Sequence, residues 1–208
     1  MSSLYAKLIA VIEQKITPMA GAIGQQKYVT SIRDGFITAL PFMIVGSFLL
    51  VFIFPPFSPD TTWGFARAWL DLAKQFEGQI LTPFDMTMGI MSVYICAAIA
   101  YNLGKHYVKS HQLDPFMCAM LSIMAFLLIA APKTKGTMPV DSLGGTGIFT
   151  AILVAIYCVE MMRFLKAHNI GIRLPDQVPP MIKNSFDLLI PVLVVVLTLY
   201  PLSLVIRS

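Results

Sequence analysis

The chain has 208 residues, of which 57% are hydrophobic and 12% are charged, and its formal net charge is +4. Soluble domains carry about a quarter charged residues, so this composition excludes an ordinary soluble protein and indicates a membrane protein. The positive charge does not indicate nucleic-acid binding, because the basic residues follow the predicted membrane topology.

Five charge-free stretches of 18 to 25 residues divide the sequence. A helix needs roughly 20 mainly apolar residues to cross about 30 Å of hydrocarbon. We therefore predict an all-α, polytopic membrane protein with about five transmembrane helices and additional interfacial amphipathic helices. The predicted spans are roughly 35–57, 84–104, 115–132, 146–165 and 186–206.

The segment before the first span predicts an amphipathic helix that lies on the membrane. Its apolar side chains share one helical face, at Leu4, Leu8, Val11 and Ile12. Charged residues interrupt the continuous apolar core that a secretory signal needs. A short solvated tail is the alternative.

Two spans carry a row of small residues on one helical face. The rows are Gly35, Ala39 and Gly46 in the first span and Gly147, Ala151 and Ala155 in the fourth. Small residues let membrane helices approach each other closely. We expect helix packing at both rows, and a dimer contact is the second possibility.

Between the first two spans, the stretch "TTWGFARAWLDLAKQFEG" predicts a further amphipathic helix. Its apolar stripe includes Trp63 and Trp69, while Arg67, Asp71 and Lys74 share the other face. Tryptophan rings favour the membrane interface, so we expect this helix to lie in the outer interface.

All three cysteines fall inside predicted spans, at Cys96, Cys118 and Cys158. Buried thiols behave as small apolar residues, so we expect no disulfide and no metal site. No His/Cys cluster has the spacing of metal ligands, and no glycine-rich phosphate loop or paired nucleophile and base occurs in the sequence. We therefore predict no cofactor and no catalytic residue.

The distribution of Lys and Arg predicts the orientation in the membrane. The N-terminal side and the loops on the same side hold ten basic residues, and the opposite side holds five. By the positive-inside rule the N-terminus is cytoplasmic, and an odd number of spans places Ser208 outside.

The stretch "LPDQVPPMIKNSFDLLIPV" places polar residues at the entrance to the last span. Pro179 and Pro180 suit a helix start, after which Asn184 and Asp187 share one face. Lipid cannot satisfy such groups, so they face protein or water. With Asp85 they are candidates for a substrate path, and contact with interfacial water is the alternative for each acid, including Glu160.

Two segments resemble a known family. "SIRDGFITALPFMIVGSFLLV" and "LPDQVPPMIKNSFDLLIP" are similar to segments of the lactose/cellobiose/diacetylchitobiose-type IIC permeases of the bacterial sugar phosphotransferase system. The resemblance implies that residues 1–208 correspond to the N-terminal scaffold and dimerisation domain of a ten-span permease in the bacterial cell membrane. The C-terminal sugar-binding domain, with the residues that engage the sugar, has no counterpart in this sequence.

The resemblance also implies partners. These are a cytoplasmic IIB protein that carries a phosphocysteine, a C-terminal IIC half or a full-length permease, and a second copy of the chain in a homodimer. Two alternatives stay open: a short membrane subunit that regulates or assembles with a complete permease, and a homo-oligomeric carrier of small solutes.

Overall fold

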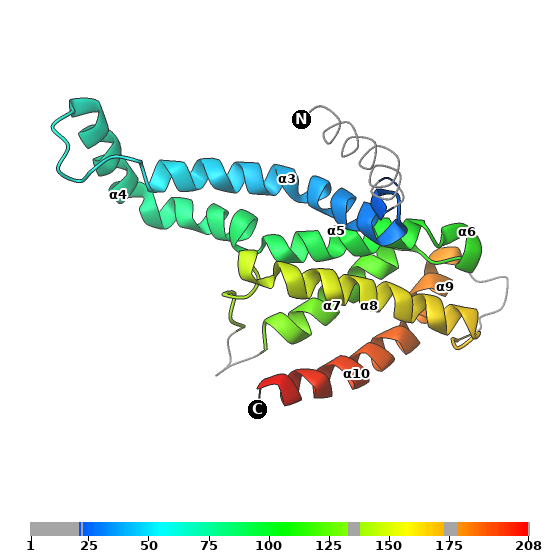
Figure 1. Cartoon of the computed structure of the whole chain (residues 1–208). Helices are drawn as coiled ribbons and strands as arrows, with labels where there is room; N and C mark the ends of the chain where they lie inside the picture. The colour runs from blue at the N-terminus through cyan, green and yellow to red at the C-terminus, as the bar shows by residue number, and fades with distance from the viewer. Residues whose placement is uncertain (1–20, 22, 133–137, 173–178, 208) are drawn as a thin grey trace, which may run out of the picture.

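The computed structural model describes residues 21, 23–132, 138–172 and 179–207, and every regular element in these ranges is a helix (Figure 1). The long helices are α3 (Lys27–Ile53), α4 (Gly64–Phe84), α5 (Met91–Lys105), α7 (Pro115–Ala130), α8 (Ile148–Ala167) and α10 (Leu189–Arg207). The short elements are the π-helical turn η2 (Asp85–Gly89), α6 (Val108–His111), the 3₁₀ turn η3 (Gly145–Gly147) and α9 (Pro180–Asp187). The predicted all-α fold is confirmed. The amphipathic helix predicted near the N-terminus lies outside the described residues.

Four to five helices of the described chain can span a membrane. The four that are long and apolar enough are Lys27–Ile53, Gly64–Lys105, Gly145–Ala167 and Ser185–Val205. Helix α7 is also apolar but has only 16 residues. It ends early because Ala131 precedes a proline and leaves the helical conformation, with φ −126° and ψ 60°.

The first span is shifted relative to its predicted position. Helix α3 begins at Lys27, eight residues before Gly35, and no side chain in the described part of the chain caps its start. The hydroxyl groups of Thr30 and Ser31, in the polar first turns, donate back to the Lys27 carbonyl at 3.0 and 2.6 Å. Helix α3 ends at Ile53, ahead of the Pro55–Pro56 pair, which cannot continue a helix.

Helix α5 is the centre of the bundle. It contacts α3, α7 and α8, and α10 packs on α7 and α8. The start of α3, α6, α9 and the end of α8 lie at one end of the bundle, which we call the α6 end (Figure 1). The α3–α4 connection and the end of α10 lie at the opposite end, as an odd number of crossings requires.

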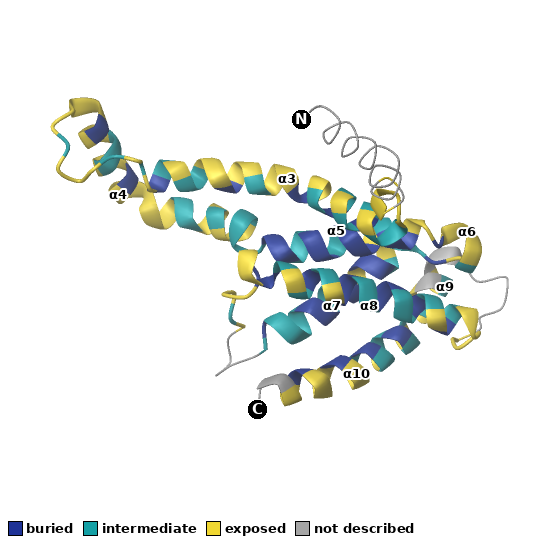
Figure 2. Cartoon of the chain, viewed as in Figure 1, coloured by how far each residue is buried: buried dark blue, intermediate teal, exposed yellow. Residues whose placement is uncertain are grey.

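The predicted amphipathic helix between the first two spans is α4, and it packs along α3. Ala66 and Ala73 are buried, and the indole N–H of Trp69 donates to the Phe52 carbonyl at 3.1 Å. Figure 2 shows exposed residues over much of α3 and α4, whereas buried residues gather on α5, α7 and α8. The position of α4 in the membrane interface stays a prediction.

Helix α4 continues through η2 almost into α5. Ile90, with φ −116° and ψ 25°, interrupts the helix and frees the backbone N–H of Ser92. That N–H donates to the Leu143 carbonyl at 2.9 Å, and the Ser92 hydroxyl donates to the Gly144 carbonyl at 2.5 Å. The loop before η3 therefore fills the break in the long helix.

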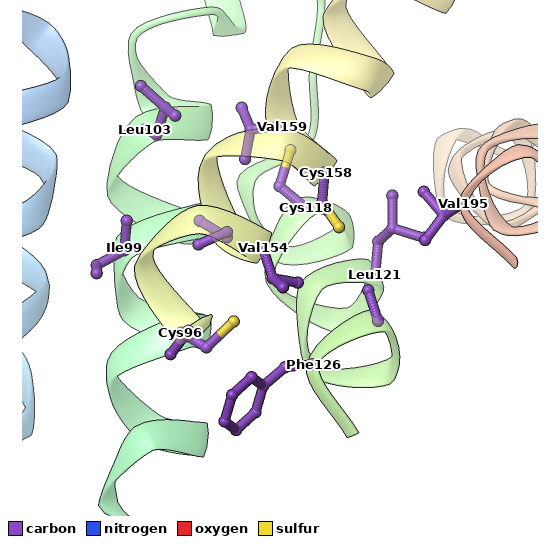
Figure 3. Close-up of a cluster of buried hydrophobic side chains, with 14 of the residues drawn as sticks. Cys96, Ile99, Leu103, Cys118, Leu121, Phe126, Val154, Cys158, Val159 and Val195 are labelled. Atoms are coloured by element: carbon purple, nitrogen blue, oxygen red, sulfur yellow. The ribbon is translucent and has the colours of Figure 1, made fainter. Parts of the chain in front are cut away.

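The core lies between α5, α7, α8 and α10 (Figure 3). All three thiols are free and fully buried in it, and Cys96 Sγ donates to the Ser122 carbonyl at 3.5 Å. Large apolar side chains are also fully buried, among them Ile95, Ile99, Leu103, Leu121, Phe126, Val159 and Val195. The cysteines thus pack as small apolar residues among branched and aromatic neighbours.

Candidate functional site

The most connected polar group at the α6 end is the carboxylate of Glu160 on α8. Oxygen Oε1 accepts from the Tyr28 hydroxyl at 2.9 Å and from the Tyr107 hydroxyl, and Oε2 accepts from Arg163 Nε at 2.6 Å. The Glu160 side chain is only 22% exposed. A carboxylate that is partly buried needs such donors, because burial penalises an unpaired charge.

Lys27 completes this group from the first residue of α3. Its ammonium donates to the Tyr107 hydroxyl at 2.5 Å and lies 4.0 Å from Glu160 Oε1. Lys27 Nζ is also 4.8 Å from the ring centroids of Tyr28 and Tyr107, and Arg163 Cζ is 5.5 Å from that of Tyr107. We call these five residues the Glu160 cluster. It joins α3, the α5–α6 turn and α8.

Tyr107 acts in this cluster as a neutral relay between a cation and an anion. Burial of its ring and the hydrogen bond to the Glu160 carboxylate raise the pKa of Tyr107 to about 12. The hydroxyl therefore stays protonated at neutral pH and can donate to Glu160 while it accepts from Lys27. The contact holds the end of α5 against α8.

A second ion pair at the α6 end joins α8 to the last helices. Lys166 Nζ lies 2.5 Å from Asp187 Oδ2, and the two side chains are 33% and 27% exposed. The pair lines a cavity of about 140 Å³ together with Asn169, Gly171 and Pro191. Asp187, predicted as a candidate for a substrate path, thus forms an ion pair with Lys166.

The other two candidates for a substrate path are placed differently. Asp85 is exposed in η2, at the opposite end of α5 from Asp187, and no hydrogen bond or ion pair within the described ranges reaches its carboxylate. Asn184 lies in α9, but its side chain is outside the described part of the structure. The three predicted residues therefore do not form one site among the described side chains.

Both rows of small residues lie in close contacts within the chain. A Cβ atom added to Gly35 would lie 2.4 Å from Ile99 Cγ1, and one added to Gly46 would lie 2.7 Å from Met88 Cβ. A Cβ atom added to Gly147 would lie 2.0 Å from the Ser142 carbonyl oxygen. The alanines of the two rows, Ala39, Ala151 and Ala155, are buried in the core.

Sequence reasoning found one residue of the Glu160 cluster and missed its partners. Glu160 stands out as an acid at the end of a span, whereas Tyr28 and Tyr107 lie 132 and 53 residues away from it along the chain. No spacing rule links them. One pattern in the sequence could have indicated these partners: tyrosines and basic residues lie next to the predicted span ends that face the α6 end.

Known proteins similar to this chain are bacterial permease components. A family described as "Phosphotransferase system, EIIC" matches residues 33–208. The cellobiose-specific EIIC component of Geobacillus stearothermophilus is 34% identical over 209 residues, which cover 91% of this chain and 44% of that protein. The lactose-specific EIICB component of Staphylococcus epidermidis is 32% identical, over 97% of this chain and 34% of that protein.

A solved structure is similar along nearly the whole chain. It is the crystal structure of ChbC, described as the IIC component from the N,N'-diacetylchitobiose-specific phosphotransferase system. The TM-score is 0.78 at 30% identity, and the match covers 95% of this chain and 47% of that one. The chain spans less than half the length of these relatives.

Proposed function

The chain belongs to the phosphotransferase system EIIC family, in the lactose, cellobiose and chitobiose class, and we propose that it is the N-terminal scaffold half of a disaccharide permease. The observation that carries this proposal is the match to ChbC, which extends over nearly all of this chain but less than half of the transporter. The chain is a multi-pass membrane protein of a bacterial transport system.

The scaffold role is supported by the way the helices are held together. The Glu160 cluster ties α3, the α5–α6 turn and α8 at one end of the bundle. At the other end, the loop before η3 bonds to the start of α5. Between these ends, close glycine contacts leave little room for α3 and α5 to slide. Such a bundle suits a static half against which a sugar-binding half moves.

We also propose the partners that such a half requires. A cytoplasmic IIB protein would phosphorylate the imported sugar, and a C-terminal IIC half would supply the sugar site. The Staphylococcus epidermidis relative is named an EIICB component, which fits a IIB partner for this class. We also propose a homodimer. Its subunits would contact each other on surfaces other than the two small-residue rows, because helices of the same chain already pack against those rows.

Cells that express only this chain should not take up labelled cellobiose above the level of cells with an empty vector. The reason is that a scaffold half lacks the sugar site. The measurement is accumulation of radiolabelled sugar in a strain without its own cellobiose EIIC, with the full-length Geobacillus stearothermophilus relative as the positive control. Uptake by this chain alone would show that it is a carrier in its own right.

The proposed orientation places the α6 end in the cytoplasm. A cysteine at Ser58, in the exposed α3–α4 connection, should react with a membrane-impermeant maleimide in intact cells, whereas one at Ser110 in α6 should react only after permeabilisation. The native thiols give little background because all three are fully buried. The reverse labelling pattern would mean that the N-terminus is outside.

A further inference from the structure

The two cations of the Glu160 cluster are its outward-facing groups. The side chains of Arg163 and Lys27 are 40% and 37% exposed, against 22% for Glu160. Two positive charges and one carboxylate leave a net charge of +1, and the carboxylate is the group covered by donors. The cluster therefore presents positive charge to its surroundings.

The cations also have hydrogen-bonding capacity left over. Arg163 uses only Nε on Glu160, and its two Nη groups have no partner among the residues that the structure describes. Among the described residues, the Lys27 ammonium has three N–H donors and makes one hydrogen bond, to Tyr107, beside its ion pair with Glu160. Since guanidinium and ammonium groups bind phosphate oxygens strongly, these donors are suited to an anion that carries several oxygens.

The position of the cluster at the ends of long apolar helices indicates which kind of anion it would bind. Lys27 is the first residue of α3, Tyr107 lies two residues beyond the end of α5, and Arg163 lies about one turn before the end of α8. The start of one helix that can span a membrane and the ends of two others thus lie at one level, where lipid headgroups would be placed by such a span. Phe164, one turn beyond Glu160, is 51% exposed and offers an apolar surface for an acyl chain.

We propose that the Glu160 cluster binds the phosphate group of an anionic phospholipid, held by Arg163 and Lys27 at the membrane boundary of the α6 end. Basic pockets between the ends of membrane helices are suited to such headgroups, because the positive charge is available beside an apolar surface. The site is independent of the proposed transport role, and a bound lipid would brace α3 against α8.

Native mass spectrometry of the purified chain in an uncharged detergent tests this site. We expect phosphatidylglycerol to be retained more strongly than phosphatidylcholine at equal concentration. Arg163→Gln should weaken phosphatidylglycerol binding about fivefold, the contribution expected of one basic residue beside an anionic lipid. Lys27→Gln should have a similar effect, and Arg163→Lys should largely restore binding.

The matched control is Arg33→Gln, which removes an equally charged residue that is paired with its neighbour Asp34 and lies outside the cluster. Circular dichroism establishes that each variant is folded. Equal retention of the two lipids would overturn the proposal, as would an Arg33→Gln effect as large as that of Arg163→Gln. Displacement of phosphatidylglycerol by an equal concentration of inorganic phosphate would assign the site to a soluble anion instead.

Discussion

Replacing Glu160 by glutamine should lower the free energy of unfolding by about 2 kcal/mol. The change leaves Lys27 and Arg163 without their counter-charge and weakens the hydrogen bond from Arg163 Nε, because a neutral amide accepts less strongly than a carboxylate. Loss of a fully buried partner would cost more, but the 22% exposure of Glu160 allows water to compensate in part. The effect is measured as the change in the SDS-induced unfolding transition in dodecyl maltoside.

Glu77→Gln is the matched control. This substitution removes the same charge, and Glu77 lies on the exposed face of α4. Its unfolding transition should stay within about 0.5 kcal/mol of the wild-type value. If both variants unfold alike, the Glu160 cluster contributes no specific stability and the bundle does not depend on it at the α6 end.

Gly35→Val should be the most damaging single substitution in the α3–α5 contact, with a loss of about 3 kcal/mol. Even the first added carbon would lie 2.4 Å from Ile99 Cγ1 and 3.0 Å from the Ile99 backbone nitrogen. Ile99 is fully buried in the core and its backbone belongs to α5, so the strain cannot be relieved by one side-chain rotation. Helix α3 would have to move away from α5.

Gly78→Ala provides the control for this prediction. A Cβ atom at Gly78 meets nothing within 4 Å, and alanine favours a helix over glycine by roughly 0.5–1 kcal/mol. The control should therefore raise stability slightly in the same unfolding assay. A Gly35→Val protein as stable as wild type would contradict the close approach of α3 and α5.

The membrane helices were predictable because their physical cause is local. A run of apolar residues long enough to cross a bilayer appears directly in the sequence, and the five charge-free runs correspond to α3, α5, α7, α8 and α10. The ends of the helices were less predictable. Helix α3 starts at Lys27, in a polar stretch that precedes the charge-free run.

The polar contacts were not predictable because their cause is the tertiary arrangement. Glu160 and Asp187 were visible as acids at the ends of spans, but an acid at a boundary can contact water, a ligand or another helix. The structure brings Tyr28 and Tyr107 to Glu160 and Lys166 to Asp187. Similarly, the loop that fills the break at Ile90 bonds to Ser92 through Gly144, and this contact spans 52 residues of sequence.

The most direct test of the scaffold proposal is equilibrium binding of labelled cellobiose and diacetylchitobiose to the purified chain in detergent. The proposal predicts no saturable binding of either sugar, because the sugar site belongs to the other half of the permease. Saturable binding of either sugar to a folded preparation would contradict it, since this chain would then form a sugar site by itself.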